Sequence, residues 1–252
     1  MSHRVLYICG GAAAVFWPPG KPEDSGTCEF ATRKCLIHCP ELLEGINQAQ
    51  VDTYGFMVGQ NPLVVATRLK REMDHLNTNV LYWFASGDCP TKDTDKVWKI
   101  MKRMQSADIP QIGFTRNKIL WNLCRGRKNI RLALTVESKK AMAGAKPGSF
   151  FSQPDYKNGV VNLILARREQ GTRQVIGACG YSWVTTSGRM KTVTEAHCTL
   201  CYEKSIGCFT DWGKYDHTIE RQELHFAPIG SIRLPTLEGE GGEQRRHRRL
   251  DI

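Results

Sequence analysis

Residues 80–88 read VLYWFASGD, a continuous apolar run of strand length that ends at Ser86, Gly87 and Asp88. A strand that is apolar on both faces is typical of the interior of a parallel sheet. From residue 60 to residue 178 the chain alternates between helical spacing and further short apolar runs. This alternation predicts βαβ units, a mostly parallel sheet and an α/β fold.

The same patterns predict the individual elements. Helices are expected at residues 60–76, from Asp93 or Thr94 onward, at 118–123 and at 138–143. Strands are expected at residues 80–85, 111–115, 130–136, 159–166 and 174–178. Residues 5–16 (VLYICGGAAAVF) are expected to form a buried strand running into a small-residue turn, with a signal peptide as the alternative.

Several βα units in a row favour a partial or full (β/α) barrel over a sandwich, and a doubly wound sheet is the alternative. In both arrangements ligands gather at the carboxyl ends of the strands. Three polar segments follow apolar runs at such ends: residues 86–88, 115–117 and 135–138. Each segment is a candidate for a functional site, although each can equally be a loop or a helix cap.

The chain has 252 residues, a length that fits one large core as well as two domains, and we expect a single α/β domain over residues 1–236. Residues 237–252 combine a Gly/Glu-rich linker with the basic run RRHRR, and we expect them to form a disordered tail. No apolar run is long enough to cross a bilayer. We therefore expect no membrane partner and a location in the cytoplasm.

The net charge of +10 favours an anionic partner, and nucleic acid is one candidate. Basic residues occur at 125–128 and at Arg167 and Arg168, but they form no recognised nucleic-acid-binding motif. The sequence also lacks a P-loop, a G-x-G-x-x-G turn, an H-E-x-x-H helix and a G-x-S-x-G elbow. These common catalytic classes are therefore not indicated.

Six of the ten cysteines fall into two groups of three. The first group is Cys28, Cys35 and Cys39, spaced C-x6-C-x3-C. In a cytosolic chain such grouping favours metal or redox chemistry over disulfides. Three thiolates in one loop are typical of a soft metal or of an iron–sulfur cluster, where they can hold three corners of a 4Fe–4S cube and leave one iron open.

The second group is Cys198, Cys201 and Cys208, which begins with a C-x2-C pair. With His197 it can form a zinc site, but it can also hold a second iron–sulfur cluster or supply a ligand to the first. The spacing does not distinguish these alternatives. The other four cysteines are scattered and are expected to be buried core residues: Cys9, Cys89, Cys124 and Cys179.

The order of these motifs resembles a known family. The cysteine loop at 28–39 is followed by WFASGD at 83–88, GFTRN at 113–117, NIRLALTVES at 129–138 and a C-terminal cysteine cluster. This order is similar to that of the phage "gene product 88" family over about residues 25–210. It also resembles, more distantly, phage proteins of the radical SAM type.

The resemblance implies a function for particular residues. Cys28, Cys35 and Cys39 would hold a 4Fe–4S cluster. The turn at Ser86, Gly87 and Asp88 would bind the methionyl amine of S-adenosylmethionine, and Thr135 and Glu137 would line the same cavity. The C-x6-C-x3-C spacing of this loop differs from the C-x3-C-x2-C spacing of radical SAM enzymes.

Two functions therefore follow from the sequence. One is a phage-type iron–sulfur protein on a radical-SAM-like barrel, with one or two 4Fe–4S clusters, an open iron for S-adenosylmethionine or another small molecule, and a place in the host cytoplasm. The other is a non-catalytic zinc or iron–sulfur module that contacts nucleic acid. The second alternative accounts for the charge of +10 and requires no radical chemistry.

Overall fold

The structure is a computed structural model. It describes residues 4–9, 11–37, 39, 45–137, 150–155, 160–167, 173–178, 183–186 and 189–192. The predicted helix at 138–143, the tail at 237–252 and the end of the predicted domain lie outside these residues.

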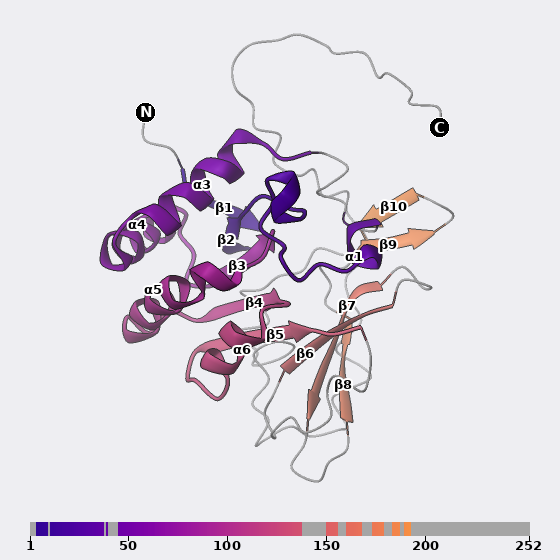
Figure 1. Cartoon of the computed structure of the whole chain (residues 1–252). Coiled ribbons are helices and arrows are strands. Elements are labelled where there is room, and N and C mark those ends of the chain that lie inside the picture. Colours follow the sequence, from indigo (N-terminus) through magenta and orange to yellow (C-terminus); the bar gives the residue numbers. More distant parts are fainter. Residues whose placement is uncertain are drawn as a thin grey trace.

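Eight strands form one mixed sheet, and their order in space follows their order in the chain (Figure 1). The strands are β1 (Leu6–Cys9), β2 (Ala12–Phe16), β3 (Leu81–Ser86), β4 (Gln111–Thr115), β5 (Ile130–Thr135), β6 (Phe150–Asp155), β7 (Val160–Arg167) and β8 (Arg173–Ala178). Neighbouring strands are parallel from β2 to β6 and antiparallel at both ends of the sheet. Strands β9 (Trp183–Thr186) and β10 (Arg189–Thr192) form a separate antiparallel pair.

The described helices lie mainly between the parallel strands. They are α1 (Arg33–Ile37), α3 (Gln48–Gly59), α4 (Pro62–His75), α5 (Thr94–Ser106) and α6 (Lys118–Cys124), with short 3-10 turns η1 (Pro22–Asp24) and η2 (Thr91–Asp93). Asparagine side chains cap three of them: Asn47 at α3, Asn61 at α4 and Asn117 at α6. Of the helices that the structure describes, none combines the length and the apolar composition needed to cross a membrane.

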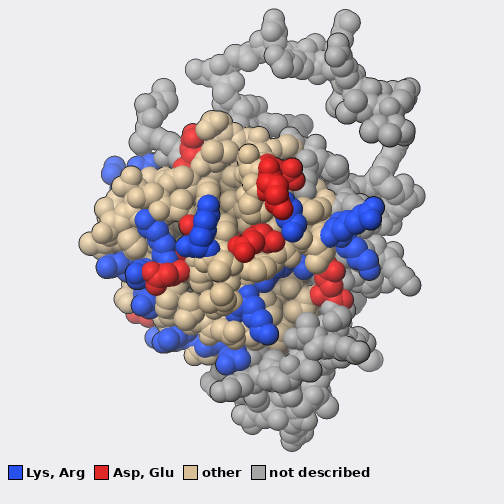
Figure 2. All heavy atoms as spheres, in the orientation of Figure 1, with Lys and Arg blue, Asp and Glu red and all other residues tan. Residues whose placement is uncertain are grey.

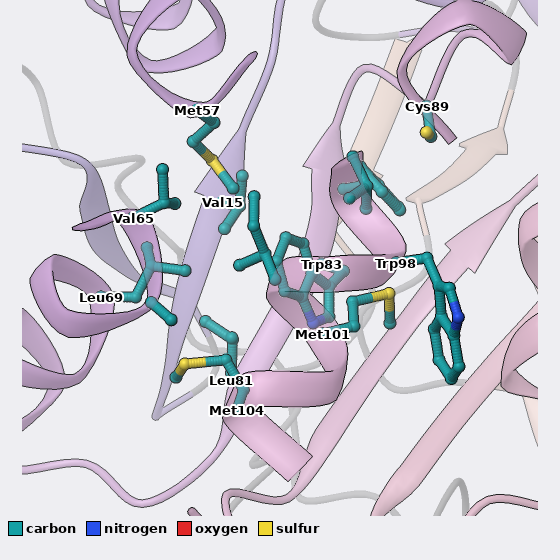
Figure 3. Close-up of a cluster of buried hydrophobic side chains, with 14 of the residues drawn as sticks. Val15, Met57, Val65, Leu69, Leu81, Trp83, Cys89, Trp98, Met101 and Met104 are labelled. Carbon is teal, nitrogen blue, oxygen red and sulfur yellow. The ribbon is translucent and has the colours of Figure 1, made fainter. Parts of the chain in front are cut away.

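Helices α3 to α6 all pack on one face of the sheet, where they bury the main core (Figure 3). Strand residues such as Leu81 and Trp83 meet Met57 of α3, Leu69 of α4 and Met101 of α5 in this core. A smaller apolar cluster contains residues that alternate with those of the main core along β2 and β3, so it lies on the other face. It comprises Cys9, Ala12, Ala14, Val80, Tyr82 and Ile112.

One-sided helices and a sequential strand order are features of a singly wound sheet, as in (β/α) barrels. A doubly wound sheet has helices on both faces and a reversal of the strand order, whereas α3 to α6 share one face and the order of the described strands does not reverse. The α/β fold and the parallel central strands predicted from the sequence are thus confirmed. The described pairings leave β1 and β8 as the outermost strands.

The structure differs from the sequence prediction at two places in the first 60 residues. Residues 5–16 form two antiparallel strands, because the chain turns at Gly11 with a φ of 77° and continues as β2 through the three alanines. Helix α3 was not predicted at all. Its sequence has no clear apolar stripe, since Val51 is exposed whereas the polar Gln50 and Thr53 are buried.

Candidate functional site at the carboxyl edge of the sheet

The turn after β3 is the centre of the candidate site. Gly87 has a φ of +74°, which favours glycine. A Cβ atom at Gly87 would lie 2.7 Å from Thr27 Oγ1 and 2.7 Å from Trp17 Cβ. The turn is therefore packed directly against the segment that follows β2 and leads into the cysteine loop.

Strand β3 contains a bulge just before this turn. Ala14 of β2 is paired with Tyr82 and Phe16 with Ser86, so three residues of β3 oppose one residue of β2. Phe84 has a φ of 55°, which is unusual for a bulky residue, and it packs against Trp17 at a ring separation of 5.2 Å. Bulges of this kind redirect the side chains that follow them.

Ser86 is one of the redirected side chains. Its hydroxyl donates to the Trp17 carbonyl at 3.0 Å and accepts from the Gln50 amide of α3 at 3.4 Å. Ser86 is 5% exposed. The predicted cofactor-binding serine thus already forms two hydrogen bonds within the protein, and these link the end of β3 to Trp17 after β2 and to α3.

Asp88 joins the ends of β3 and β4. One carboxylate oxygen accepts hydrogen bonds from the Thr115 hydroxyl at 2.5 Å and from the Cys89 amide at 2.7 Å. The other accepts from the Arg116 amide at 2.7 Å. Burial raises the pKa of Asp88 to about 6, although these hydrogen bonds act in the opposite direction.

Asn117 supports the same corner from the start of α6. Its carbonyl oxygen accepts from the Ile119 and Leu120 amides, and its amide group donates to the Cys89 carbonyl at 2.9 Å and the Thr94 hydroxyl at 2.7 Å. Asn117 is fully buried. The polar strand ends at 86–88 and 115–117 therefore form one hydrogen-bonded support.

The cysteine loop is attached at two points to the segment that follows β3. The Thr27 hydroxyl donates to the Pro18 carbonyl at 2.9 Å and accepts from the Asp88 amide at 3.1 Å. The Glu29 carboxylate accepts from the Thr91 amide at 2.6 Å and from the Thr91 hydroxyl at 3.1 Å. Cys28 lies between these two attachment points and is partly exposed.

A third attachment joins the loop to the end of β5. The Thr32 hydroxyl donates to the Glu137 carboxylate, and Arg116 forms an ion pair with the same carboxylate oxygen at 3.4 Å. The Thr32 hydroxyl also accepts from the Cys35 amide at 3.2 Å, at the start of α1. Thr135, the other predicted residue here, is partly buried at the end of β5.

The three cysteines of the first group thus lie on a loop that borders the carboxyl edge of the sheet. Cys28, Cys35 and Cys39 are all partly exposed. In the part of the chain that the structure describes, no three His, Cys, Asp or Glu residues are gathered closely enough to hold a metal ion. The loop is therefore in place at the predicted edge, but its sulfur atoms do not converge on one point.

The other cysteines divide into two sets. Cys198, Cys201 and Cys208, with His197, lie outside the described residues, as does Cys179. Cys9, Cys89 and Cys124 are buried, as predicted for core residues. Burial raises the pKa of the Cys89 thiol and raises that of Cys124 to about 12, so neither is a reactive thiolate.

The sequence indicated Ser86, Gly87, Asp88, Thr135 and Glu137 as candidate site residues, but no pattern in it indicated the residues that connect them to the loop. Thr27, Glu29 and Thr32 are ordinary polar residues of a loop, and only their long-range contacts distinguish them. Arg116 and Asn117 did carry a signal, because they follow a predicted strand directly.

Comparisons with known proteins found no family model, no curated protein and no solved structure that matches the chain.

Proposed function

We propose that the chain is an iron–sulfur protein in which Cys28, Cys35 and Cys39 hold a 4Fe–4S cluster beside the carboxyl edge of a partial or full (β/α) barrel that resembles the radical SAM fold. The observation that carries the proposal is the attachment of the cysteine loop at three points, through Thr27 to the turn after β3, through Glu29 to η2 and through Thr32 to the end of β5. The carboxyl edge is where α/β sheets bind ligands.

The donor atoms suit this group, although the loop must rearrange to bring them together. Three partly exposed thiols on one loop match the thiolate ligands of an iron–sulfur cluster. Thiolate ligands repel one another until a cation is bound, and in small metal sites binding and local folding are coupled. We therefore expect the sulfur atoms to converge on binding, while the three attachments keep the loop at the edge.

A cluster held by three cysteines would leave one iron open for S-adenosylmethionine or another small molecule, and when reduced it would supply an electron. In this proposal Ser86, Gly87 and Asp88 support the site. The Ser86 and Asp88 side chains form hydrogen bonds within the protein, and Gly87 is packed closely against Thr27 and Trp17. Glu137 contacts the cysteine loop through Thr32, and Thr135 precedes Glu137 by two residues at the end of β5. Zinc remains the alternative metal for the second cysteine group, since histidine and cysteine ligands suit it.

The test is a metal analysis of protein purified without oxygen. Iron, sulfide and zinc are counted on one sample, and the visible absorption of the same sample is recorded. We expect a brown protein with about four iron and four sulfide per bound cluster, as the cluster type requires. Cys35→Ala should lose most of the iron of this site. Cys124→Ala is the matched control, because Cys124 is a buried core thiol, and it should keep the wild-type iron content.

Colourless protein with stoichiometric zinc would contradict the cluster assignment. Full iron content in Cys35→Ala would show that this residue is not a ligand. If the second cysteine group holds a separate cluster, Cys201→Ala should remove a further portion of iron, and the two losses should add up.

A further inference from the structure

The positive charge of this protein is concentrated in one part of the folded chain. Residues 96–131 contain ten Lys and Arg residues and a single acidic residue, Asp108. This segment spans α5, β4, α6 and the loop after α6. Figure 2 shows blue side chains along the lower part of the drawn face, where α5 and α6 lie in Figure 1.

The fold brings cations from two elements to one point on this surface. The Lys102 ammonium of α5 lies 5.4 Å from the centre of the Trp98 ring, and the Arg127 guanidinium lies 5.3 Å from the same ring. The Gln105 amide holds the loop in place by donating to the Lys128 carbonyl at 2.8 Å. Trp98 itself is 7% exposed and belongs to the main core, so the two cations lie over the ring of a buried side chain.

Neighbouring residues extend this basic surface. Lys99 and Arg103 are four residues apart on α5, so they lie on the same side of the helix. Arg125 lies over the Trp121 ring at 5.5 Å. Lys99 is paired with Asp95, and Lys128 is near Asp108 at 3.5 Å. Within the described ranges no ion pair involves Lys102, Arg103, Arg125 or Arg127.

We propose that this α5–α6 surface, formed by Lys99, Lys102, Arg103, Arg125, Arg127 and Lys128, binds the phosphate backbone of a nucleic acid. Like charges that are held together raise the free energy of the isolated protein, and a polyanion that binds there removes this cost. Arginine suits phosphate because its planar guanidinium donates two parallel hydrogen bonds.

A membrane surface fits less well. Helices that bind at a lipid interface expose large apolar side chains alongside their basic ones. All the large apolar side chains of α5 are buried, namely Val97, Trp98, Ile100, Met101 and Met104. The proposal is independent of the cysteine loop, because neither the loop nor any metal contributes to this surface.

The experiment measures binding of the full chain to a labelled 30-base-pair DNA, and to single-stranded DNA and RNA of the same sequence, by fluorescence anisotropy at several salt concentrations. The test protein carries Lys102→Gln, Arg103→Gln and Arg127→Gln. The control carries Lys70→Gln, Arg71→Gln and Lys92→Gln, which remove the same charge from exposed positions elsewhere. Another protein carries glutamine in place of the four arginines at 245, 246, 248 and 249.

We expect the test protein to bind at least about tenfold more weakly, and the slope of log affinity against log salt to become shallower by roughly 2, since each lost phosphate contact contributes about 0.7 to 0.9. The control should change much less. Comparing the three nucleic acids shows which form the surface prefers.

If the test and control proteins lose the same amount of affinity, net charge alone explains the effect and the proposal is overturned. Loss of binding only in the protein with the altered tail would also overturn it, as would binding to phosphatidylserine vesicles without binding to any of the three nucleic acids. Circular dichroism of each variant confirms that the proteins compared are folded.

Discussion

Thr32 and Glu137 are 105 positions apart in the chain, yet the Thr32 hydroxyl donates a hydrogen bond to the Glu137 carboxylate. The same hydroxyl accepts from the Cys35 amide, and the same carboxylate pairs with Arg116. This short chain of contacts links the helix that carries a proposed cluster ligand to the ends of β4 and β5. It fixes the cysteine loop to the sheet at one of its three attachment points.

Thr32→Val should release this attachment. Valine has the shape of threonine but cannot bond to Glu137 or to the Cys35 amide, so we expect amide hydrogen exchange at Cys35 to become faster. The free energy of unfolding should fall by only about 1 kcal/mol, the typical net value of a partly exposed hydrogen bond. The control is Thr78→Val, which removes a hydrogen bond to the Gly11 carbonyl far from the loop. Unchanged exchange at Cys35 in Thr32→Val would contradict the attachment.

Gly87→Ala should be strongly destabilising. The added Cβ would meet Thr27 Oγ1 and Trp17 Cβ at 2.7 Å, and alanine is strained at a φ of +74°. We expect the free energy of unfolding, measured with urea, to fall by about 2 to 4 kcal/mol, because overpacking and backbone strain add. Gly55→Ala is the control.

At Gly55 on α3 a Cβ meets no atom within 4 Å. Alanine there should leave stability unchanged or raise it by up to about 1 kcal/mol, because alanine favours a helix more than glycine does. Similar losses in both variants would show that the packing of the turn against Trp17 and Thr27 is not the cause.

The strands and the strand-end turns could be predicted because their signals are local. The run VLYWFA needs only its own sequence to indicate a buried strand, and Asn117 follows a strand and precedes a helix. The bulge at Phe84 could not be predicted, since it depends on packing against Trp17, 67 positions earlier in the chain. The attachment of Thr32 to Glu137 left no local signal either. The position of the cysteine loop therefore depends on long-range contacts in the folded protein and could not be predicted from the spacing of its cysteines.

Asp88 should make stability depend on pH in a defined direction. Its pKa is raised from 3.8 to about 6 by burial, so the folded protein binds this proton more tightly than the unfolded chain does. The resulting stabilisation is complete below about pH 4 and is lost as the pH rises through 6. Through this group alone, the free energy of unfolding should fall by about 2 to 3 kcal/mol from pH 4 to pH 7.

Asp88→Asn isolates this contribution, because asparagine does not titrate. We expect the variant to be less stable than the wild type at every pH, since asparagine has one acceptor oxygen for three donors. The difference in urea midpoint between the two proteins should be largest near pH 4. A constant difference between pH 4 and pH 7 would show that Asp88 does not titrate in this window.

Binding of S-adenosylmethionine can be tested separately from binding of the cluster. Reduced protein that contains iron and sulfide should give an electron paramagnetic resonance spectrum, and an open iron should change that spectrum when S-adenosylmethionine is added. Glu137→Gln should weaken the response while the iron content stays the same. An unchanged wild-type spectrum would show that the iron–sulfur protein does not bind S-adenosylmethionine at the cluster, and it would favour the non-catalytic alternative.

Thiol reactivity should separate the loop cysteines from the core cysteines without any metal. In metal-free protein at pH 8, we expect iodoacetamide to modify Cys28, Cys35 and Cys39 at least about tenfold faster than Cys89 and Cys124, because the core thiols are buried and have raised pKa values. Peptide mass spectrometry assigns each site, and in urea all five should react alike. Iron and sulfide should protect the loop cysteines alone. Protection of Cys124 to the same degree would point to general stabilisation of the fold instead of ligation by the loop.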